Sequence, residues 1–430
     1  MATLEFIRFT PHAAELVADK VQWVPLSNGI IERMPQICWG SGEPWREANL
    51  WLLDRSHRKD IATIRSAATS LHAYAKWLET TKPRTHWWDF PAKEANRCLV
   101  RYRGALIHER DAGRLAPSTV SNRMRVVVQF YRWLSLERLL SPSWPMWKER
   151  SVGIRLIDPW GFERTINVMS TDLAIPNRKR NSSGLEDSLT PVSAAERESI
   201  LNLSTEHCSL ELSLMLQLGF GTGMRLGSIC DLKVRTITNA IPEPFGHDAG
   251  LIAIGPNAAP PVHTKFRTHG HVLVPGSLLN DLNKYRNSPR RLERQALAAP
   301  ENKQLLFLTR FGNPYLKRGS DKSTAVNVEM HKLRAVARLH GMNLDYFRFH
   351  QSRVTFACDA VRIANEVEGI DPVEVVGDML FQKNRATTEA YIKYVKKQPV
   401  KAAVANEFTK VFLGILERRK ESKDAWPDHP

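Results

Sequence analysis

Residues 347–360 read "FRFHQSRVTFACDA", with a histidine and an arginine three positions apart at the start of a small, apolar run. On a helix, side chains three apart share a face, with Cβ atoms about 5–6 Å apart, so His350 and Arg353 can reach one chemical group together. The arginine fork suits phosphate oxygens, and histidine gives or takes a proton near neutral pH. A helix cap beside a surface ion pair would use the same residues. Other motifs in the chain are needed to distinguish a phosphate-binding pair from this alternative.

The composition predicts a globular, intracellular protein with a polyanionic partner. The 430 residues include 61 Lys and Arg against 45 Asp and Glu, a formal net charge of +16. Such an excess favours phosphate-rich partners because neutralised phosphates release counterions. No apolar run approaches the ~18–20 residues of a membrane span, and the N-terminus lacks the features of a secretory signal. Five cysteines without CxxC spacing indicate free thiols in the cytoplasm and argue against a zinc site.

Helical periodicity predicts an all-helical bundle in the first half of the chain. Apolar residues recur at helical spacing over 60–80 and over 116–137, where Ser118 is a candidate N-cap. A third helix is expected to end near Gly113. Several arginines take outward positions on these helices, and a merely solvated helix face is the alternative interpretation.

A second, mixed domain is predicted from residue 193. Ser193 and Glu196 have the spacing of a capping box. Helices are expected to follow, then a short strand in "GLIAIGP" (250–256) and a hairpin that ends in "HGHVLVP" (269–275). The fold class is therefore mainly α with a small β-hairpin or sheet in the second domain, an α+β arrangement.

Three further motifs join the opening pair. "GTGMRLGSICDL" (221–232) places Arg225 after a glycine-rich turn, "HTKFRTHGHVLVP" (263–275) places Lys265 on one arm of the hairpin, and "RATTEAYIKYV" (385–395) supplies Tyr391. Each motif alone is weak. Their order and spacing resemble those of the tyrosine site-specific recombinases, the phage-integrase family.

The resemblance covers about residues 55–415. "TGMRLGSICDL" is similar to the first arginine box of the family, "FHQSRVTFACDAV" to the second, and "MLFQKNRATTEAYIKYV" to the box that carries the nucleophile; "STVSNRMRVVVQFYRWL" resembles the last long helix of the family's core-binding module. The resemblance implies these catalytic residues: Arg225, Lys265, His350, Arg353, Gln382 and Tyr391. It also implies that outward arginines contact DNA, and these are Arg97, Arg101, Arg123, Arg125, Arg132 and Arg267.

Three positions depart from the family pattern. Ser228 stands where an acidic residue usually supports the first arginine, Val354 replaces a histidine, and Gln382 takes the place of a histidine or tryptophan. The Gln382 amide can still donate a hydrogen bond to a phosphate oxygen. The departures leave two outcomes open, a weakened site or a divergent subfamily.

The domains expected from composition and resemblance together are an N-terminal extension (1–54), a helical DNA-binding domain (55–150), a linker (151–192), a catalytic domain (193–417) and a charged tail (418–430). The linker assignment rests on the Pro, Ser and basic residues of "IPNRKRNSSGLEDSLTPVS" (175–193).

The implied activity is cleavage and rejoining of DNA through a 3′-phosphotyrosyl intermediate. Tyrosine attack stores the energy of the phosphodiester bond, so no metal, ATP or other cofactor is needed. Lysine can protonate the departing 5′ oxygen, which arginine does poorly, and this favours Lys265 over Arg267. Tyr394 is a rival nucleophile, although the T-T-x-x-Y spacing selects Tyr391. Rival functions are a DNA-binding relative without catalysis and a type IB topoisomerase.

An apolar stripe beyond the nucleophile predicts assembly. It consists of Val404, Phe408, Val411, Phe412, Ile415 and Leu416. It can pack on its own domain or on a neighbouring protomer. The resemblance implies a monomer in solution that forms a tetramer on double-stranded DNA, in the service of a mobile element, with accessory DNA-bending proteins or a sister recombinase as further partners.

Overall fold

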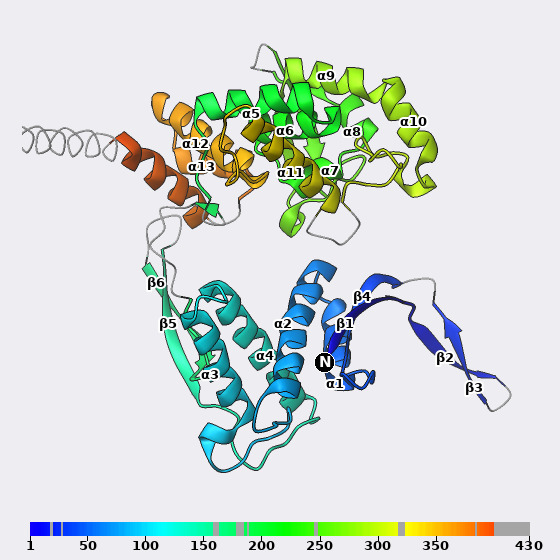
Figure 1. Ribbon diagram of the computed structural model, residues 1–430, viewed down its shortest axis with the longest axis vertical. Helices are drawn as coiled ribbons and strands as arrows, with labels where there is room; N and C mark the ends of the chain where they lie inside the picture. Colours follow the sequence, from blue (N-terminus) through cyan, green and yellow to red (C-terminus); the bar gives the residue numbers. More distant parts are fainter. Residues whose placement is uncertain are drawn as a thin grey trace, which may run out of the picture. The chain divides into compact units, whose positions relative to one another are not determined.

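Helices α1 to α4 form the centre of the first of two units, residues 1–181, in the computed structural model (Figure 1). The structure describes residues 1–17, 20–26, 29–157, 163–177, 185–186, 189–244, 248–316, 323–382 and 385–399. The helices of this unit are α1 (Arg46–Ser56), α2 (Ile61–Thr80), α3 (Cys98–Asp111) and α4 (Pro117–Leu136), with the 3-10 turn η1 (Glu94–Asn96) before α3.

The apolar spacing of α2 and α4 explains why they pack on each other. α2 buries Ile64, Leu71 and Leu78, and α4 buries Met124 and Val127, all on the predicted faces. Burying a side chain of this size stabilises the fold by about 1.5–3 kcal/mol. The helices predicted over 60–80 and 116–137 are confirmed. α4 starts one residue before the predicted cap, because Pro117 occupies its first position, where the fixed φ of proline suits a helix.

The predicted N-terminal extension is part of this unit. Its strands are β1 (Thr3–Phe9), β2 (His12–Val17), β3 (Lys20–Pro25) and β4 (Ile31–Cys38), paired antiparallel as β1 with β4 and β2 with β3. Met34 and Ile37 of β4 and Trp45 before α1 are fully buried in the same core as Leu71. The boundary predicted at residue 54 falls inside α1, so residues 1–54 do not form a separate segment.

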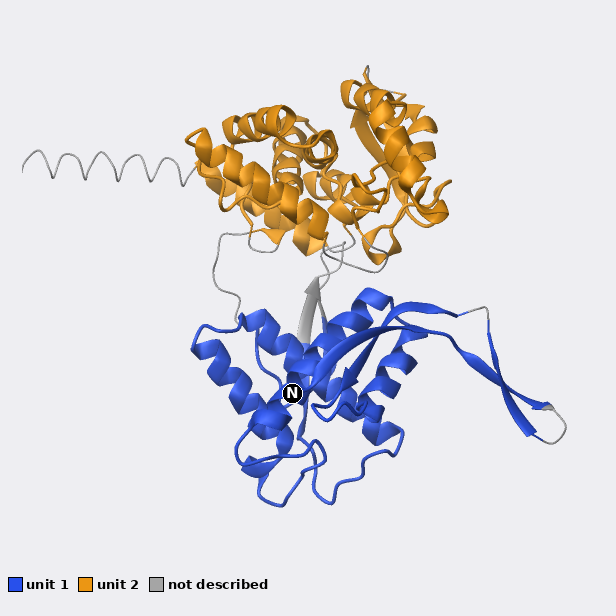
Figure 2. Cartoon of the chain, turned by 45° about the vertical axis from the view of Figure 1, so that its right-hand side comes forward, with its two compact units in different colours: residues 1–181 blue, residues 182–430 orange. Residues whose placement is uncertain are grey.

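The linker predicted over 151–192 is wrong for its first part. β5 (Glu149–Ile157) and β6 (Glu163–Thr171) pair antiparallel, and Leu173 and Ile175 are buried in the core of the first unit. The β-branched residues of these strands favour extended structure, a signal that the polar composition concealed. The chain divides at residues 181 and 182 (Figure 2).

The second unit, residues 182–430, is mainly helical with one small sheet. Its helices are α5 (Ala194–His207), α6 (Leu210–Thr222), α7 (Leu226–Cys230), α8 (Val234–Thr238), α9 (Gly276–Arg286), α10 (Pro289–Leu297), α11 (Thr324–Leu339), α12 (His350–Glu366) and α13 (Pro372–Met379), followed by a helix over 385–399. The antiparallel sheet has the order β7 (Ile241–Pro242), β8 (Ala249–Ile254), β9 (Gly270–Pro275), and the short 3-10 turns are η3 (Lys265–Arg267) and η4 (Pro300–Asn302).

Helix α6 lies in the middle of this unit and positions the site. Its residues are buried on nearly every side, as expected for a helix that is apolar all round, and it contacts α5, α12 and β9. The predicted capping box of α5 is present, with both hydrogen bonds between Ser193 and Glu196 formed. The predicted strand and hairpin are β8 and β9, so the mainly α fold with a small sheet in the second unit is confirmed.

Two sequence predictions concern residues that the structure does not describe. The apolar stripe from Val404 to Leu416 and the charged tail (418–430) lie outside the described residues. Among the helices that the structure describes, none is long and apolar enough to cross a membrane.

Candidate active site

The first turn of α12 brings His350 and Arg353 onto the same anionic group. His350 Nε2 lies 3.0 Å from Oε2 of Glu186, and Arg353 Nε lies 3.5 Å from the same oxygen. Three residues apart on one helix, the two side chains share a face, as the spacing requires. The structure therefore shows the pair in contact with one anion, and this anion is a carboxylate of the same chain.

Arg353 is held in place by the two other motifs of the site. Its Nη1 donates to the carbonyl of Gly223, 2.6 Å away, and its Nη2 donates to the carbonyl of Leu380, 2.9 Å away. Only 2% of the residue is exposed. Burial, together with the charge of Arg225, lowers the pKa of Arg353 to about 10. Both terminal nitrogens serve to orient the guanidinium, which leaves its Nε edge toward Glu186.

The glycine-rich turn after α6 requires its glycine. Gly223 ends α6 in the left-handed region with φ of 66°, and a Cβ there would lie 2.4 Å from the ring of Phe356. Glycine adopts this conformation without a steric penalty. The turn places Arg225 immediately before α7, at its N-cap position, where its Nη2 lies 3.8 Å from Glu186 Oε1.

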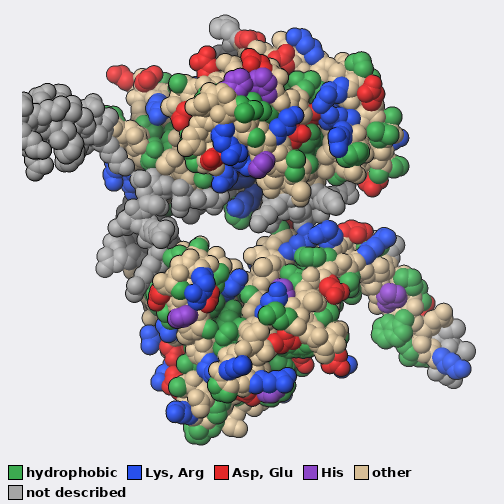
Figure 3. Space-filling model, viewed as in Figure 1, with side chains coloured by type: hydrophobic (Ala, Val, Ile, Leu, Met, Phe, Trp, Pro, Cys, Tyr) green, Lys and Arg blue, Asp and Glu red, His purple; other side chains and the backbone are tan. Residues whose placement is uncertain are grey.

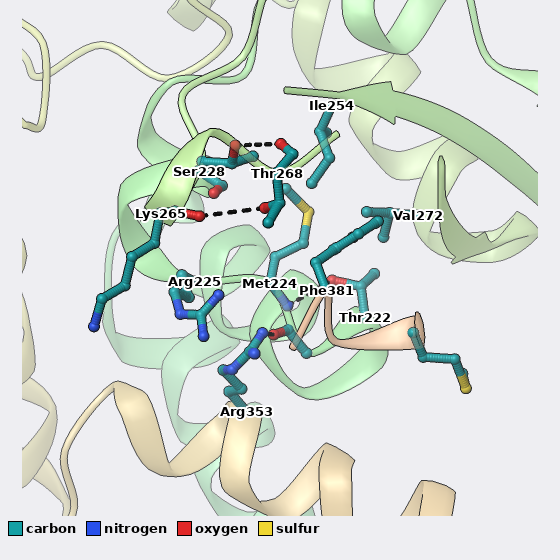
Figure 4. A pocket seen from close by; sticks show the side chains of 13 residues that line it. Thr222, Met224, Arg225, Ser228, Ile254, Lys265, Thr268, Val272, Arg353 and Phe381 are labelled. Carbon is teal, nitrogen blue, oxygen red and sulfur yellow. Dashed lines mark hydrogen bonds between the residues drawn. The ribbon is translucent and has the colours of Figure 1, made fainter. Parts of the chain in front are cut away.

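Arg225 and Arg353 line one pocket together with residues of the β8–β9 connection. Ser228, Lys265 and Phe381 are among the other lining residues. Figure 4 shows the guanidinium groups of both arginines pointing into the same space. Two positive charges that converge on one point need an anion between them or they repel.

The side-chain amide of Gln382 completes the contacts to the carboxylate. Gln382 Nε2 donates to Glu186 Oε1 over 2.9 Å, and the buried Thr388 hydroxyl donates to Gln382 Oε1 over 2.8 Å. Because the hydroxyl holds the oxygen end of the amide, its NH₂ end faces the anion. Gln382 stands at one of the departures from the family pattern, and it contributes a donor there.

Tyr391 lies buried beside these charges, on the helix over 385–399. It is fully buried, and its hydroxyl has no hydrogen-bond partner among the described residues. Burial raises the pKa of the Tyr391 hydroxyl; the negative charge of Glu186 raises it further, and the charges of Arg353 and Arg225 act against this. A buried hydroxyl without a partner is costly and is often found at functional positions.

The rival tyrosine has different surroundings. Tyr394 is half-buried, and burial raises its pKa, while the charge of Arg362 acts against this. The charges around Glu186 act on Tyr391. Of the two tyrosines, Tyr391 is the one that is fully buried, and the choice of Tyr391 as nucleophile stays a prediction.

Lys265 lies at the edge of the pocket on the β8–β9 connection. Its side chain is exposed, and its Nζ lies 5.3 Å from the centre of the Phe266 ring. Figure 4 shows its ammonium end apart from the two guanidinium groups. Phe266 and Arg267 have φ of 63° and 53°, a left-handed conformation that costs energy for such residues and that clusters at functional sites.

Sequence reasoning missed the residue on which the site converges, Glu186. Burial alone would raise its pKa, but the hydrogen bond from His350 and the charges of Arg353, His350 and Arg225 outweigh burial and lower the pKa to about 2. The carboxylate is therefore ionised at neutral pH. Glu186 lies in the predicted linker, and the one signal for its placement is the pair Leu185 and Leu189, which pack against α12 and α13.

The predicted DNA-contacting arginines of the first unit differ in how far they face outward. Arg97 is 8% exposed, and its guanidinium donates to the carbonyls of Pro91, Ala92 and Pro145. The prediction that it faces outward is wrong, because Arg97 holds two loops together. DNA contacts of the others remain predictions: Arg101, Arg123, Arg125, Arg132 and, in the second unit, Arg267.

Those arginines have contacts within the chain that a partner would have to compete with. Arg101 donates to the carbonyl of Pro83, and Arg132 contacts both carboxylate oxygens of Glu149. Arg125 is exposed and contacts Asn122. Figure 3 shows Lys and Arg side chains interspersed with acidic ones on the visible face of each unit.

Neither a protein-family model nor a curated protein matches this chain. Among solved structures, the chain is similar to the Tn1549 transposon integrase in complex with circular intermediate DNA, with 14% identity, 80% of this chain and 94% of that chain covered, and a TM-score of 0.47. It is similar to the XerH site-specific recombinase bound to difH substrate, with 14% identity, 76% of each chain covered and a TM-score of 0.45. It is also similar to a lambda integrase (75–356) dimer bound to a COC′ core site, with 12% identity, 81% of this chain and 94% of that chain covered, and a TM-score of 0.47. The chain thus resembles these tyrosine recombinases in fold over about 80% of its length at low identity.

Proposed function

We propose that the chain cleaves and rejoins DNA strands, with Tyr391 as the nucleophile and a phosphodiester as the group held by the site. The observation that carries the proposal is the convergence of Arg225, His350, Arg353 and Gln382 on both oxygens of one anion. The pKa of the buried Tyr391 hydroxyl is influenced by Glu186 and by the same arginines. A set of donors around an anion beside an oxygen nucleophile is what phosphoryl transfer to a side chain requires.

The donors stabilise the negative charge that spreads over the phosphoryl oxygens as the reaction proceeds. The two nonbridging oxygens of a phosphodiester would take the positions of the two Glu186 oxygens. His350 and Arg353 then serve one oxygen, and Arg225 and Gln382 serve the other. A preorganised donor of this kind is typically worth about 2.7–4 kcal/mol of transition-state stabilisation.

The bond changes balance without a further reactant. The Tyr391 oxygen forms a bond to phosphorus while the bond from phosphorus to the 5′ oxygen breaks, and the tyrosine proton passes to a base, for which His350 is suited. The departing 5′ oxygen takes a proton, which Lys265 can deliver from the edge of the pocket. Attack by a 5′ hydroxyl on the phosphotyrosine reverses these steps and rejoins a strand.

Covalent capture on DNA tests the proposal. Full-length protein is incubated with a pool of nicked duplexes of random sequence in the presence of EDTA, and complexes that survive SDS are isolated. We expect such complexes with the natural chain and none with Tyr391→Phe. A protein that binds the pool without any SDS-resistant complex would be a DNA-binding relative without catalysis, and the proposal would fail.

The type of strand transfer is tested separately. Recombinant products from two DNA sites support a recombinase that serves a mobile element, whereas relaxation of a supercoiled plasmid of arbitrary sequence, without such products, indicates a type IB topoisomerase. We also propose that protomers assemble on DNA through the stripe of residues 404–416. The double variant Phe408→Asp with Phe412→Asp should impair assembly and recombination more than binding to a single site, whereas misfolding of the isolated monomer would show that the stripe packs on its own domain.

A further inference from the structure

The carboxylate of Glu186 occupies the position that the proposed function gives to the DNA phosphate. Both of its oxygens are used: Oε2 contacts His350 and Arg353, and Oε1 contacts Gln382 and Arg225. These contacts are the ones that would hold the phosphodiester. The inference drawn from them rests on the proposed function and concerns how the same site is regulated.

A carboxylate and a phosphodiester are equivalent from the viewpoint of these donors. Each carries one negative charge shared by two oxygens, and arginine binds both in the same forked geometry. The two anions cannot be held together, because they need the same donors and repel each other. DNA can therefore enter only when Glu186 leaves.

The segment that carries Glu186 is fastened on one side of the site. Leu185 and Leu189 pack against the apolar surface of α12 and α13. Downstream, Gln351 donates to the carbonyl of Thr190, and Thr355 accepts from the backbone nitrogen of Val192. These contacts keep the acid at a high effective concentration next to the donors.

Glu186 can be displaced with less disruption of the fold than Arg353. Its side chain is 17% exposed, against 3% for Arg353. Glu186 also lies outside the α-helices and strands of the unit. Its departure removes the contacts of one side chain, whereas departure of Arg353 would disrupt the turn at Gly223 and the end of α13. The acid can therefore exchange with an incoming anion while the donors stay in place.

We propose that Glu186 is an internal competitor that closes the anion site of the DNA-free protein and gives way to the phosphate. It keeps the two arginines paired until DNA arrives, since an unpaired buried charge is strongly destabilising, and it opposes binding to phosphates that lack further contacts with the protein. The rival role is permanent support of Arg225, in place of the acidic residue that the family pattern would put at Ser228. The two roles predict opposite effects of removing the charge.

Thermal unfolding in inorganic phosphate separates the two roles. With full-length protein, Glu186→Gln should unfold at a lower temperature than the natural chain in a phosphate-free buffer, because the arginines lose their partner. Added inorganic phosphate should then raise its unfolding temperature, with an affinity at least about tenfold higher than that of the natural chain, a difference of about 1.4 kcal/mol. A phosphate affinity that is unchanged or lower than that of the natural chain would overturn the proposal and favour permanent support.

Two further variants control for general effects. Glu211→Gln removes one negative charge from a buried acid–arginine cluster elsewhere in the same unit, so it should lower stability without raising phosphate affinity. Glu186→Gln combined with Arg353→Gln should lose the gain in affinity, and a gain that persists would place the phosphate outside this site and refute the proposal. If Glu186→Gln unfolds too readily to measure, Glu186→Asp, which shortens the reach of the carboxylate, should give a smaller gain of the same sign.

The outcome for DNA separates this proposal from the activity on which it rests. Glu186→Gln should bind random-sequence duplex more tightly than Glu211→Gln does at the same ionic strength. Tighter binding of phosphate and duplex without any covalent complex would retain the competitor role and refute strand cleavage. Covalent complexes from the natural chain, with no gain in affinity for Glu186→Gln, would retain strand cleavage and refute the competitor.

Discussion

Two carboxylates of the second unit, Glu211 and the half-buried Glu186, each contact two arginines, yet they differ in what surrounds them. Glu211, in the first turn of α6, is fully buried. It accepts from Arg290 Nε at 2.9 Å and Nη2 at 3.0 Å, lies 2.9 Å from Arg294 Nη1, and accepts from the Tyr285 hydroxyl at 3.0 Å. None of these four residues has a buried polar atom left without a partner. The Glu211 cluster is complete in itself.

The Glu186 cluster is incomplete in the same terms. The Nε of Arg353 lies 3.5 Å from Glu186 Oε2 without forming a hydrogen bond, and the hydroxyl of Tyr391 is buried without a hydrogen-bond partner among the described residues. Its acid, Glu186, lies outside the α-helices and strands of the unit, and its donors come from the turn before α7, the start of α12 and the residues after α13. A carboxylate between two arginines is therefore not enough to indicate a functional site. The unsatisfied tyrosine and the replaceable acid distinguish the two clusters.

The two tyrosines should give the largest contrast. Tyr391→Phe removes the proposed nucleophile and should abolish SDS-resistant DNA complexes, while the free energy of unfolding changes by less than about 1 kcal/mol because no hydrogen bond is lost. Tyr285→Phe should keep the DNA complexes and lower the free energy of unfolding by about 1.5–3 kcal/mol, the value of a hydrogen bond to a charged group. Complex formation by Tyr391→Phe would show that Tyr391 is not the nucleophile and would make Tyr394 the candidate.

The second largest contrast is expected between Arg353 and Arg294, in the rate of DNA cleavage and in stability. Arg353→Lys keeps the charge and loses the fork, so we expect the rate of DNA cleavage to fall by about 10²–10³. Arg294→Lys should leave that rate nearly unchanged. It should lower the free energy of unfolding by about 1–3 kcal/mol, because the contacts of Arg294 with the Leu308 carbonyl and with Glu211 are weakened. Single-turnover cleavage and chemical denaturation measure the two effects, and equal cleavage rates in the two variants would refute the distinction.

Thr388 should have a smaller effect, as a residue that positions Gln382. Thr388→Val removes the hydroxyl that orients the amide and should slow cleavage by about tenfold, which corresponds to about 1.4 kcal/mol. Thr388→Ser keeps the hydroxyl and should restore most of the rate. If the serine variant is as slow as the valine variant, the side chain contributes by packing and the positioning role is wrong.

The last expected effect concerns stability in acid and leaves the cleavage reaction aside. The folded chain lowers the pKa of Glu186 to about 2, below the ordinary value of about 4.3, so folding favours its ionised form. The resulting stabilisation is complete above about pH 4.5 and is lost as the pH falls toward 2. Glu186→Gln should therefore show a flatter loss of stability between these pH values than the natural chain. The same slope in both would mean that the carboxylate is not held by these donors.

The sequence predicted the parts of the site that depend on local spacing. The face shared by His350 and Arg353, the turn before Arg225 and the spacing from Thr388 to Tyr391 follow from positions a few residues apart. The helices α2, α4 and α5 were predictable because their apolar faces and the Ser193 capping box are periodic or local. Whether these residues act on DNA remains a prediction.

What the sequence did not reveal depends on distant contacts. Glu186 meets its donors across about 40 to 200 positions of the chain, and no local pattern distinguishes it from the polar residues around it. Arg97 looked like an outward arginine because its spacing does not show that three carbonyls surround it. The strands of residues 149–171 were hidden by their polar composition, since β structure depends on the partner strand as much as on the residues themselves.

The most direct test of the central claim is the chemical location of the DNA adduct. Full-length protein is captured on the nicked random-sequence pool, digested with nuclease and protease, and its modified peptide is sequenced by mass spectrometry. We predict a phosphonucleotide on the oxygen of Tyr391. An adduct on Tyr394 or on any other residue, or no adduct at all in a pool that the protein binds, would contradict the claim that this cluster is a strand-cleaving site.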